Sequence, residues 1–366
     1  ESHSIYSSHV YSPLPNNTTP IEPTYDEETK YVDGRVVIQK YFDYVLTKDH
    51  RTFIIGEDVG KLGGVNLEFD GLQEKHGEMR VTDTGIREAS ILGQGIGASL
   101  RGLKPIVDIQ YLDYLIYCLQ GISDDLATLG FRSAGGQRAP VIIRTKGHRL
   151  EGIWHTGSPM QMLLGSIRGT HLCVPRNSVQ AAGLYNTLLQ GNDPGVVIEV
   201  LNAYRLKEAL PNNIGEYSVA LGEPELIRSG KDLTIVTYGA CCAVALCASK
   251  FLSTIDIDCE IIDVQTLLPF DLNHSIKSSL EKTSAVIFLD EDVPGGATAY
   301  MMQKVLEDQN AWDLLELPPQ TVTATDHRSA FGSDGDYYCK PNEDDIILKA
   351  YNLMRIRHPN TYPSIH

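Results

Sequence analysis

Short apolar runs alternate with longer segments of helical period from about residue 31 to residue 324. Consecutive parallel strands need a crossover connection, usually a helix, so this alternation predicts an α/β fold with a doubly wound parallel sheet. The first half indicates strands at Thr52–Ile55, Pro105–Ile109, Val141–Arg144 and Val196–Val200, and helices near residues 34–48, 85–101, 113–129 and 177–190.

A stretch rich in Pro, Asn and Gly, Pro211–Gly222, separates this half from a second alternating series. We therefore predict two doubly wound domains, at 31–207 and 225–366, with a linker at 208–224. A length of 366 residues suits two domains of ordinary size. The second series indicates strands at Leu233–Thr237, Cys259–Val264, Ala285–Leu289 and Thr321–Ala324, and helices from about Cys242, near residues 271–281 and from about Ala297.

Residues 1–30 differ in composition from both series. They hold four prolines, several Ser and Thr, and a single basic residue, Lys30, so they cannot bury enough apolar surface to fold alone. We interpret them as an extended linker or docking arm. The chain begins with Glu1 and shows no signal-peptide pattern, so we expect it to continue a longer polypeptide.

The net charge of the chain indicates what kind of partner it binds, and its cysteines indicate which cellular compartment it occupies. The chain has 31 Lys and Arg against 47 Asp and Glu, a net charge of −16, which disfavours nucleic acid as a partner and suits a basic protein. The longest uncharged run, Leu233–Ser249, contains Gly239 and several hydroxyl residues, so we expect no membrane segment. Seven cysteines without a CxxC pair indicate free thiols in a reducing compartment, which for a bacterial protein is the cytoplasm.

One motif has the form of a dinucleotide-binding fingerprint. Gly93-Gln-Gly95-Ile-Gly97-Ala reads GxGxxA, whose glycines must lie in a strand-to-helix turn if they are to admit a pyrophosphate. The preceding residues already have helical period, so the glycines fall inside a predicted helix, and we expect them to let a neighbouring helix pack closely. Two histidines, His148 and His155, also lack the i, i+4 spacing of a helical zinc pair.

Several short segments, each uninformative alone, occur in a distinctive order. They are Ile55–Val59, Gly63–Val65, Arg80–Glu88, Gly102–Pro105, Asp108–Tyr114, Trp154–Pro159, Val174–Asn177 and Ala181–Leu184. Over roughly residues 31–357, this ordered set resembles the β subunit of the thiamine-diphosphate-dependent 2-oxo acid dehydrogenases, the decarboxylating component of those multienzyme complexes.

The resemblance implies a transketolase-like pyrimidine-binding domain followed by a transketolase-like C-terminal domain. In this family a GDG motif with a following Asn holds the diphosphate and its Mg²⁺, whereas Asp334-Gly335-Asp336 inverts that motif here. The resemblance therefore implies an α subunit that holds Mg²⁺ and forms a heterotetramer with this chain, and the first 30 residues suit a once-fused α–β polypeptide. A lipoylated acyltransferase core is the second implied partner.

Glu88 matches the catalytic glutamate of the family. Its carboxyl group would hydrogen-bond the aminopyrimidine ring of thiamine diphosphate and favour the imino form, whose nitrogen takes the proton of the reactive thiazolium carbon. That role needs a carboxyl group able to share a proton. We therefore expect burial to raise the pKa of Glu88 by more than the helix dipole lowers it.

Four further residues are implied around the same pocket. Tyr114 matches the aromatic residue that stacks on the aminopyrimidine ring. Ile86 and Gln110 would line the pocket, and Glu57 would lie behind them.

His155 matches the family histidine near the reacting centre. A group that titrates near neutrality could protonate the substrate oxygen there or assist acyl transfer to lipoamide. By the same alignment, Val141, Leu188, Gly191 and Asp193 fall near a loop that binds a structural monovalent cation, such as potassium. Backbone carbonyls carry most of such a site.

Two regions depart from the family. Gly85 occupies a position where the family usually has Pro, and Arg87 one where it usually has Ser or Cys. Adjacent residues of a helix point in directions about 100° apart, so we do not expect the Arg87 side chain to face Glu88. The segment Ser333–Asp345 also differs, and its carboxylates predict a docking site on the second domain for a basic module of the acyltransferase core. These acidic residues are Asp334, Asp336, Glu343, Asp344 and Asp345.

Three functions remain open from the residues alone. The first is a β subunit that, with an α partner, oxidatively decarboxylates a 2-oxo acid and transfers the acyl group to lipoamide. The second is the C-terminal part of a transketolase-like or deoxyxylulose-phosphate synthase enzyme, and the third is a non-catalytic scaffold subunit of that fold. The presence of Glu88 and Tyr114 favours an enzyme. Gln110, Tyr114 and Val174–Arg176 favour branched-chain 2-oxo acids over pyruvate.

Overall fold

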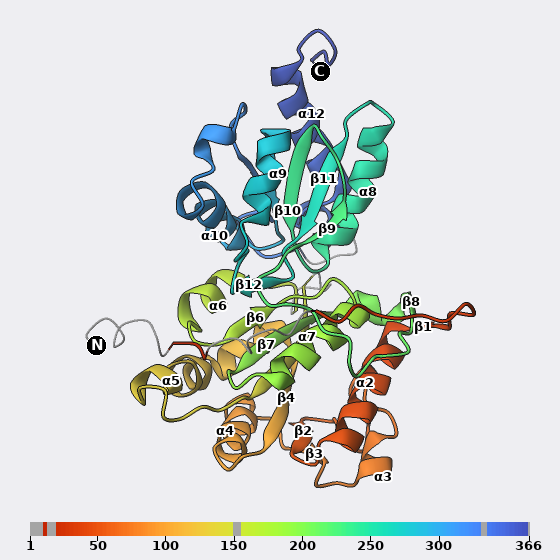
Figure 1. Cartoon of the computed structure of the whole chain (residues 1–366), viewed down its shortest axis with the longest axis vertical. Helices are drawn as coiled ribbons and strands as arrows, with labels where there is room; N and C mark the ends of the chain where they lie inside the picture. The colour runs from red at the N-terminus through yellow and green to blue at the C-terminus, as the bar shows by residue number, and fades with distance from the viewer. Residues whose placement is uncertain (1–9, 13–19, 149–154, 331–334, 365–366) are drawn as a thin grey trace. The chain divides into compact units, whose positions relative to one another are not determined.

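A computed structural model describes residues 10–12, 20–148, 155–330 and 335–364. The chain divides into two compact units (Figure 1). Unit 1 comprises residues 1–147 and 163–221, and unit 2 comprises residues 148–162 and 222–366. Residues 148–162 thus interrupt unit 1 in the sequence but group with unit 2. In the described part of the chain, no helix combines the length and the apolar composition needed to cross a membrane.

Unit 1 is built on parallel strands: β2 (Thr52–Gly56), β3 (Val81–Asp83), β4 (Lys104–Tyr111), β5 (Ile142–Gly147), β6 (His171–Cys173) and β7 (Gly195–Val200). They pair in the order β6-β7-β5-β4-β2-β3. The reversal of direction along this order is that of a doubly wound sheet, as the strand–helix alternation predicts. A separate antiparallel pair joins β1 (Tyr31–Asp33) to β8 (Lys207–Ala209).

Helices cover both faces of this sheet (Figure 1). The regular helices of unit 1 are α2 (Gly34–Lys48), α3 (Leu72–His76), α4 (Glu88–Ser99) and α7 (Ser178–Gln190). Apolar side chains of α2 and α7 form one core with alternate residues of the strands, among them Ile54 and Ile106. The opposite face of β4 meets α4, where Val107 packs against Gly95. The short 3₁₀ helix η3 (Leu201–Arg205) follows β7.

The single helix predicted near 113–129 is wrong. The structure has a 3₁₀ helix η1 (Leu112–Tyr117), a π-helix η2 (Gly121–Ala127) and a short α-helix α5 (Leu129–Arg132) instead. Leu112, Leu115, Cys118, Ile122 and Leu126 are buried at spacings of three and four, which is the period of one amphipathic helix, so the pattern predicts a single helix although the backbone forms three pieces.

The described part of the N-terminal arm lies on unit 1. Residues 20–30 run beside residues 210–218, where the amides of Leu210, Asn212 and Ser218 donate to backbone carbonyls of the arm at 2.9–3.0 Å. Backbone pairing of this kind holds an apolar-poor segment without a core of its own.

Unit 2 is a second, smaller α/β unit. Its strands are β9 (Glu225–Arg228), β10 (Leu233–Thr237), β11 (Cys259–Asp263), β12 (Thr266–Leu268), β13 (Val286–Leu289) and β14 (Gln320–Val322). Five of them pair in the order β14-β13-β10-β11-β9, with only β9 antiparallel to its neighbour. The helices are α8 (Cys241–Ser253), α9 (Ser275–Thr283), α10 (Ala297–Gln303), η4 (Lys304–Asp308), η5 (Trp312–Leu314), α11 (Gly335–Cys339) and α12 (Glu343–Arg357).

The helices of unit 2 pack on the two faces of its sheet through different kinds of side chain. Apolar residues of α8 and α12 cover one sheet face, whereas Thr234 on the other face hydrogen-bonds Ser279 and Thr283 of α9. The seven cysteines all lie in the described residues and form no disulfide there; Cys247 is exposed and the other six are buried. Between the units in sequence lies α6 (Met160–Ser166), which begins in unit 2 and ends in unit 1.

Candidate active site

Glu88 is the first residue of α4 and directly follows the extended residue Arg87, whose φ is −160° and ψ 97°. The helix therefore begins three residues later than the predicted 85–101. The Glu88 side chain is half-buried. A carboxylate at this position lies among the unpaired N–H groups of the first helical turn.

Glu88 acts electrostatically on three predicted or neighbouring groups. Burial, reinforced by carboxylates that include Glu88, raises the pKa of Glu57. Burial and the Glu88 carboxylate together raise the pKa of Cys118 to about 12. The pKa of Tyr114 is raised too, by burial first and then by acidic neighbours, Glu88 among them. These groups therefore lie near Glu88 in unit 1, and we call the surroundings of Glu57, Ile86, Glu88, Gln110 and Tyr114 the predicted pocket.

The carboxyl ends of β2 and β4 supply the rest of this pocket. Gln110 is near the end of β4, and its amide nitrogen is buried without a hydrogen-bond partner among the described residues. Tyr114 lies on η1, edge-on to Tyr111 at 5.9 Å between ring centroids. The side chain of Ile86 is 76% exposed. An unpaired amide, an accessible aliphatic group and a half-buried aromatic ring fit a flat heteroaromatic ligand with ring nitrogens.

A group of buried charges beneath the pocket was not predicted. We call Glu68, Asp108, Arg144, Lys146 and Glu199 the buried ion cluster; each is at most 1% exposed. Arg144 donates to Glu199 at 2.7 Å and to Glu68 at 3.2 Å, and it also contacts Asp108. Lys146 contacts Asp108 at 3.0 Å and Glu68 at 3.2 Å. Every carboxylate of the cluster therefore has a cationic partner.

The buried ion cluster adjoins the pocket through β2 and β4. Gly56 pairs with Asp108 in register, and a Cβ at Gly56 would lie 2.8 Å from the Asp108 carbonyl oxygen. The backbone that leads into Glu57 is therefore packed directly on Asp108. The Asp108 carboxylate is also one of the groups that raise the pKa of Glu57. The buried ion cluster therefore supports the backbone that positions Glu57.

His155 belongs to unit 2 and is half-buried. Its chain neighbours Thr156 and Ser158 are each 7% exposed. Trp154, which belongs to the same sequence motif, lies outside the described residues. The structure thus gathers Glu57, Ile86, Glu88, Gln110 and Tyr114 in unit 1 and assigns His155 to the other unit.

Three of the four residues predicted at a monovalent-cation loop have described hydrogen bonds or ion pairs through groups that could act as ligands. The Asp193 carboxylate pairs with Arg138 at 2.9 Å and accepts two hydrogen bonds from Ser12 at 2.7 Å. The carbonyls of Val141 and Leu188 accept backbone N–H groups of Gly195 and Gly191 at 3.0 Å. An arginine thus pairs with the carboxylate of this loop, and the binding of a potassium ion there stays a prediction.

The glycine motif lies inside α4, where no strand-to-helix turn is available for a pyrophosphate. The expected packing partner was a helix, and that detail is wrong. Gly95 faces strand β4, and a Cβ there would come within 2.4 Å of Val107. Gly93 and Gly97 instead have no atom within 4 Å of the position that a Cβ would take. The two outer glycines leave a flat, open strip on α4.

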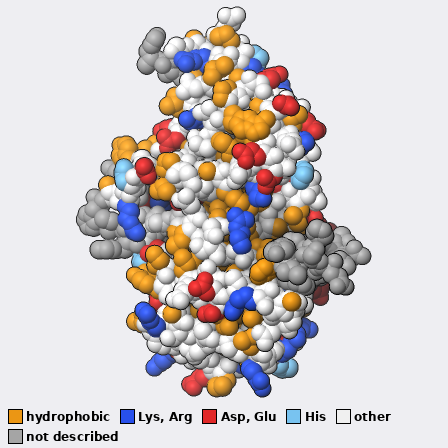
Figure 2. All heavy atoms as spheres, turned by 90° about the vertical axis from the view of Figure 1, so that its left-hand side faces the viewer, with side chains coloured by type: hydrophobic (Ala, Val, Ile, Leu, Met, Phe, Trp, Pro, Cys, Tyr) orange, Lys and Arg blue, Asp and Glu red, His pale blue; other side chains and the backbone are white. Residues whose placement is uncertain are grey.

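The predicted acidic cluster has local roles. Asp345 forms a capping box with Asn342 at the start of α12, and Asp344 accepts a hydrogen bond from Tyr337 at 2.6 Å. Asp334 lies outside the described residues. On the face shown in Figure 2, acidic and basic side chains are interspersed with exposed apolar ones.

Comparisons with known proteins cover most of the chain. Residues 30–207 match the transketolase pyrimidine binding domain, and residues 222–342 match the transketolase C-terminal domain. The chain is 32% identical to the pyruvate dehydrogenase E1 component subunit beta-4, chloroplastic, of Oryza sativa subsp. japonica, over 84% of this chain and 75% of the relative.

Two relatives from Bacillus subtilis have similar identity. The pyruvate dehydrogenase E1 component subunit beta is 31% identical over 84% of this chain and 94% of the relative. The 2-oxoisovalerate dehydrogenase subunit beta is 30% identical over 74% of this chain and 82% of the relative. A solved structure titled as an inactive beta4 tetramer of a split-gene transketolase covers 88% of this chain and 98% of its own, with a TM-score of 0.68 and 18% identity. That last likeness concerns the fold alone.

Proposed function

The chain belongs to the β subunits of the 2-oxo acid dehydrogenase decarboxylating component, and we propose that with an α subunit it catalyses the thiamine-diphosphate-dependent oxidative decarboxylation of a 2-oxo acid. The acyl group then passes to lipoamide on an acyltransferase core, which makes the enzyme an acyl-transferring oxidoreductase. The observation that supports this proposal most is the position of Glu88 at the start of α4, where its carboxylate acts on Glu57 and Tyr114.

Thiamine diphosphate, when bound, supplies the nucleophilic carbon for decarboxylation. When the cofactor is bound, Glu88 would hydrogen-bond a ring nitrogen of the aminopyrimidine and share its proton, and Tyr114 would offer an aromatic face to that ring. The buried amide nitrogen of Gln110, which has no partner among the described residues, would donate to an acceptor of the bound group. Ile86 contributes apolar surface. Burial and neighbouring carboxylates raise the pKa of Glu57.

The α subunit completes this pocket. The chain has no GDG motif, so we assign the diphosphate and Mg²⁺ to the partner. Large apolar side chains on η1 and at the end of α4 are exposed, including Ile116 at 58%, Tyr117 at 56% and Leu100 at 47%. Together with Ile86 and the open glycine strip of α4, they form a surface that an apolar face of the α subunit would cover in a heterotetramer.

His155 is the second catalytic residue of the proposal. An imidazole can donate or accept a proton, so His155 can donate a proton to the substrate oxygen or assist acyl transfer to lipoamide. We propose a structural potassium ion at the loop of Val141, Leu188, Gly191 and Asp193, and it takes no part in these steps.

Reconstitution with the α subunit tests the proposal. We expect the αβ complex with thiamine diphosphate and Mg²⁺ to decarboxylate branched-chain 2-oxo acids or pyruvate, and neither chain alone to do so. A panel of these acids, with xylulose 5-phosphate as the transketolase control, identifies the substrate. Ketol transfer without 2-oxo acid decarboxylation would favour the transketolase-like alternative, and inactivity of the intact complex toward the whole panel would favour the scaffold alternative.

A further inference from the structure

The segment that carries His155 is attached to the rest of unit 2 at two points. The segment begins where β5 of unit 1 ends, at residue 148, and the chain returns to unit 1 within α6. Its partners follow β13, where three consecutive acidic residues occur. We call Asp290, Glu291 and Asp292 the acid run; all three are at most 6% exposed.

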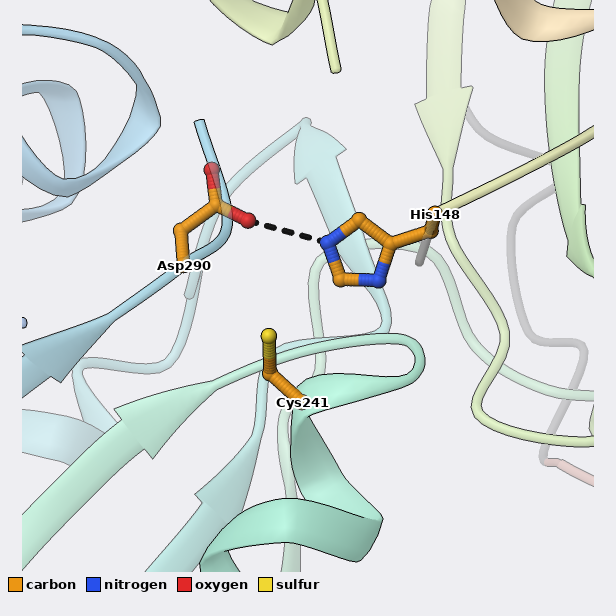
Figure 3. A group of neighbouring side chains, drawn as sticks. All are labelled: His148, Cys241 and Asp290. Carbon is orange, nitrogen blue, oxygen red and sulfur yellow. Dashed lines mark hydrogen bonds and ion pairs between the residues drawn. The ribbon is translucent and has the colours of Figure 1, made fainter. Parts of the chain in front are cut away.

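The first point of attachment is His148, whose imidazole is almost fully buried in unit 2. Its Nε2 lies 2.9 Å from Asp290 Oδ1, and its Nδ1 accepts the backbone N–H of Ala240 at 2.8 Å (Figure 3). Because Ala240 donates to Nδ1, the proton of the neutral ring is on Nε2 and points at Asp290. The ring also stacks on Tyr238, with 4.9 Å between centroids.

Figure 3 shows that Cys241 lies beside this pair, so the three side chains have the composition of a metal site. The hydrogen bonds favour another interpretation. Both imidazole nitrogens are engaged, one by Asp290 and one by the Ala240 amide, which leaves no lone pair of His148 directed at a metal ion. His148 is instead a satisfied anchor that joins the segment to β13 and to the start of α8.

The second point of attachment is Asp292. Its Oδ2 accepts the backbone N–H of Gln161 at 3.0 Å, and its Oδ1 accepts the backbone N–H of Val293 at 2.8 Å. Gly296 makes room for this carboxylate, since a Cβ there would lie 2.3 Å from Asp292 Oδ2. A charged acceptor buried against an amide makes a strong hydrogen bond, because its loss would leave both groups unsatisfied.

Residues of the segment pack on the same acid run between the two attachments. Thr156, Gly157 and Ser158 line a small cavity of about 70 Å³ together with Glu291 and Asp292. A space of this size holds no more than a few water molecules, so the segment lies against the acid run.

We propose that Asp290 and Asp292 are positioning residues for His155: Asp290 holds the start of its segment through the His148 imidazole, and Asp292 holds the end through the Gln161 amide. Neither carboxylate touches the reacting atoms. The link to catalysis rests on the proposed function of His155, whereas the attachment of the segment does not. The acid run thus explains how unit 2 orients a histidine that the sequence places between two parts of unit 1.

Hydrogen exchange of the αβ complex, followed by mass spectrometry, tests the attachment. Asp292→Asn is isosteric but has a single oxygen for at least two amides, so we expect exchange in residues 155–162 to accelerate about tenfold or more. Asp290→Ala should have a similar effect, and Asp290→Asn, which keeps an oxygen for Nε2–H, should retain most of the protection. Asp308→Asn, at an exposed pair with Lys304, is the matched control. Unchanged exchange in residues 155–162 for Asp292→Asn and Asp290→Ala would overturn the proposal.

A double-mutant cycle tests whether the carboxylates act through His155. We expect Asp292→Asn to lower kcat about tenfold with little change in KM in the otherwise wild-type complex, and by less than twofold in the His155→Ala background. Equal losses in both backgrounds would mean that Asp292 has only a structural role, and would overturn the positioning of His155. Full activity of His155→Ala would instead contradict the proposed role of His155, and the exchange experiment would still decide the attachment.

Discussion

The two units bury carboxylates in different ways. In unit 1, the three acidic groups of the buried ion cluster face Arg144 and Lys146, and each carboxylate contacts at least one of these cations. In unit 2, the buried Lys340 lies 3.7 Å from Glu291, while Asp290 and Asp292 contact the His148 imidazole and backbone N–H groups. In unit 1 the buried carboxylates are paired with buried cations, whereas in unit 2 they are stabilised mainly by hydrogen bonds from neutral groups.

The pKa values of one carboxyl group in each unit express this difference. Burial would raise the pKa of Glu68, but Lys146 and Arg144 outweigh it and lower the pKa to about 2. Burial and the neighbouring Asp290 raise the pKa of Asp292 to about 6. Glu68 in the buried ion cluster is therefore charged at ordinary pH, and the acid run holds a group, Asp292, that titrates close to neutrality. In unit 1 the pocket thus lies next to paired buried charges, whereas in unit 2 the His155 segment contacts a carboxylate whose charge depends on pH.

Removing a cation from the buried ion cluster should cause the largest loss of stability. Arg144→Met leaves Glu199, Asp108 and Glu68 short of a partner in a water-free interior, so we expect the free energy of unfolding to fall by about 3–5 kcal/mol. Urea titration of the αβ complex and of the variant measures it. Arg51→Met breaks an exposed pair with Asp49 and should leave the unfolding midpoint nearly unchanged. Equal shifts for the two variants would contradict the comparison.

The acid run should give a smaller effect that depends on pH. An acid whose pKa is about 6 in the folded state and 3.8 when unfolded binds its proton more tightly in the folded protein. Stability therefore rises as pH falls through 6, by about 1.4 kcal/mol between pH 7 and pH 5.

The groups that face Asp292 are Asp290, Glu291, Lys340, His327 and Arg328, and they are unchanged in Asp292→Asn. The difference between wild type and this variant at the two pH values, measured by urea titration, therefore isolates Asp292. Glu68 contributes nothing in this window, because its stabilisation is lost only below about pH 4.5. A variant with the same pH dependence as the wild type would show that Asp292 is not the titrating group.

The smallest effect is expected at the surface of unit 2. If α12 docks a basic module of the acyltransferase core, Glu343→Gln with Asp344→Asn should slow association in 0.01 M salt, where the Debye length is about 30 Å, and matter little in 0.1 M salt, where it is about 10 Å. Asp345 is left unchanged, because it belongs to the capping box of α12. Association rates from stopped-flow measurements provide the test, and identical rates for both proteins at low salt would remove these carboxylates from docking.

Local patterns in the sequence predicted much of the fold. The helix at 34–48 and the strand Leu233–Thr237 occur with the predicted bounds, because periodic apolar residues mark both. The start of α4 was also close, and with it the position of Glu88. These features depend on residues within one or two turns of each other.

Features that depend on distant residues were missed. Arg144 and Lys146 lie in a predicted apolar strand or beside it, and nothing local indicates that Glu68 and Glu199 meet them from other elements. The attachment of His148 to Asp290 joins residues 142 positions apart. Buried charges are recognisable from sequence only as isolated polar residues, since their partners are set by the topology of the sheet.

The most direct test of the account is the decarboxylation rate of the reconstituted αβ complex with Glu88→Gln. The amide is nearly isosteric, so the variant should fold and assemble normally, but it cannot share a proton with the aminopyrimidine ring. We predict that kcat falls by about 10²–10⁴-fold, the usual contribution of a general acid–base group. A rate close to that of the wild-type complex would contradict the assignment of Glu88 and, with it, the proposed active site.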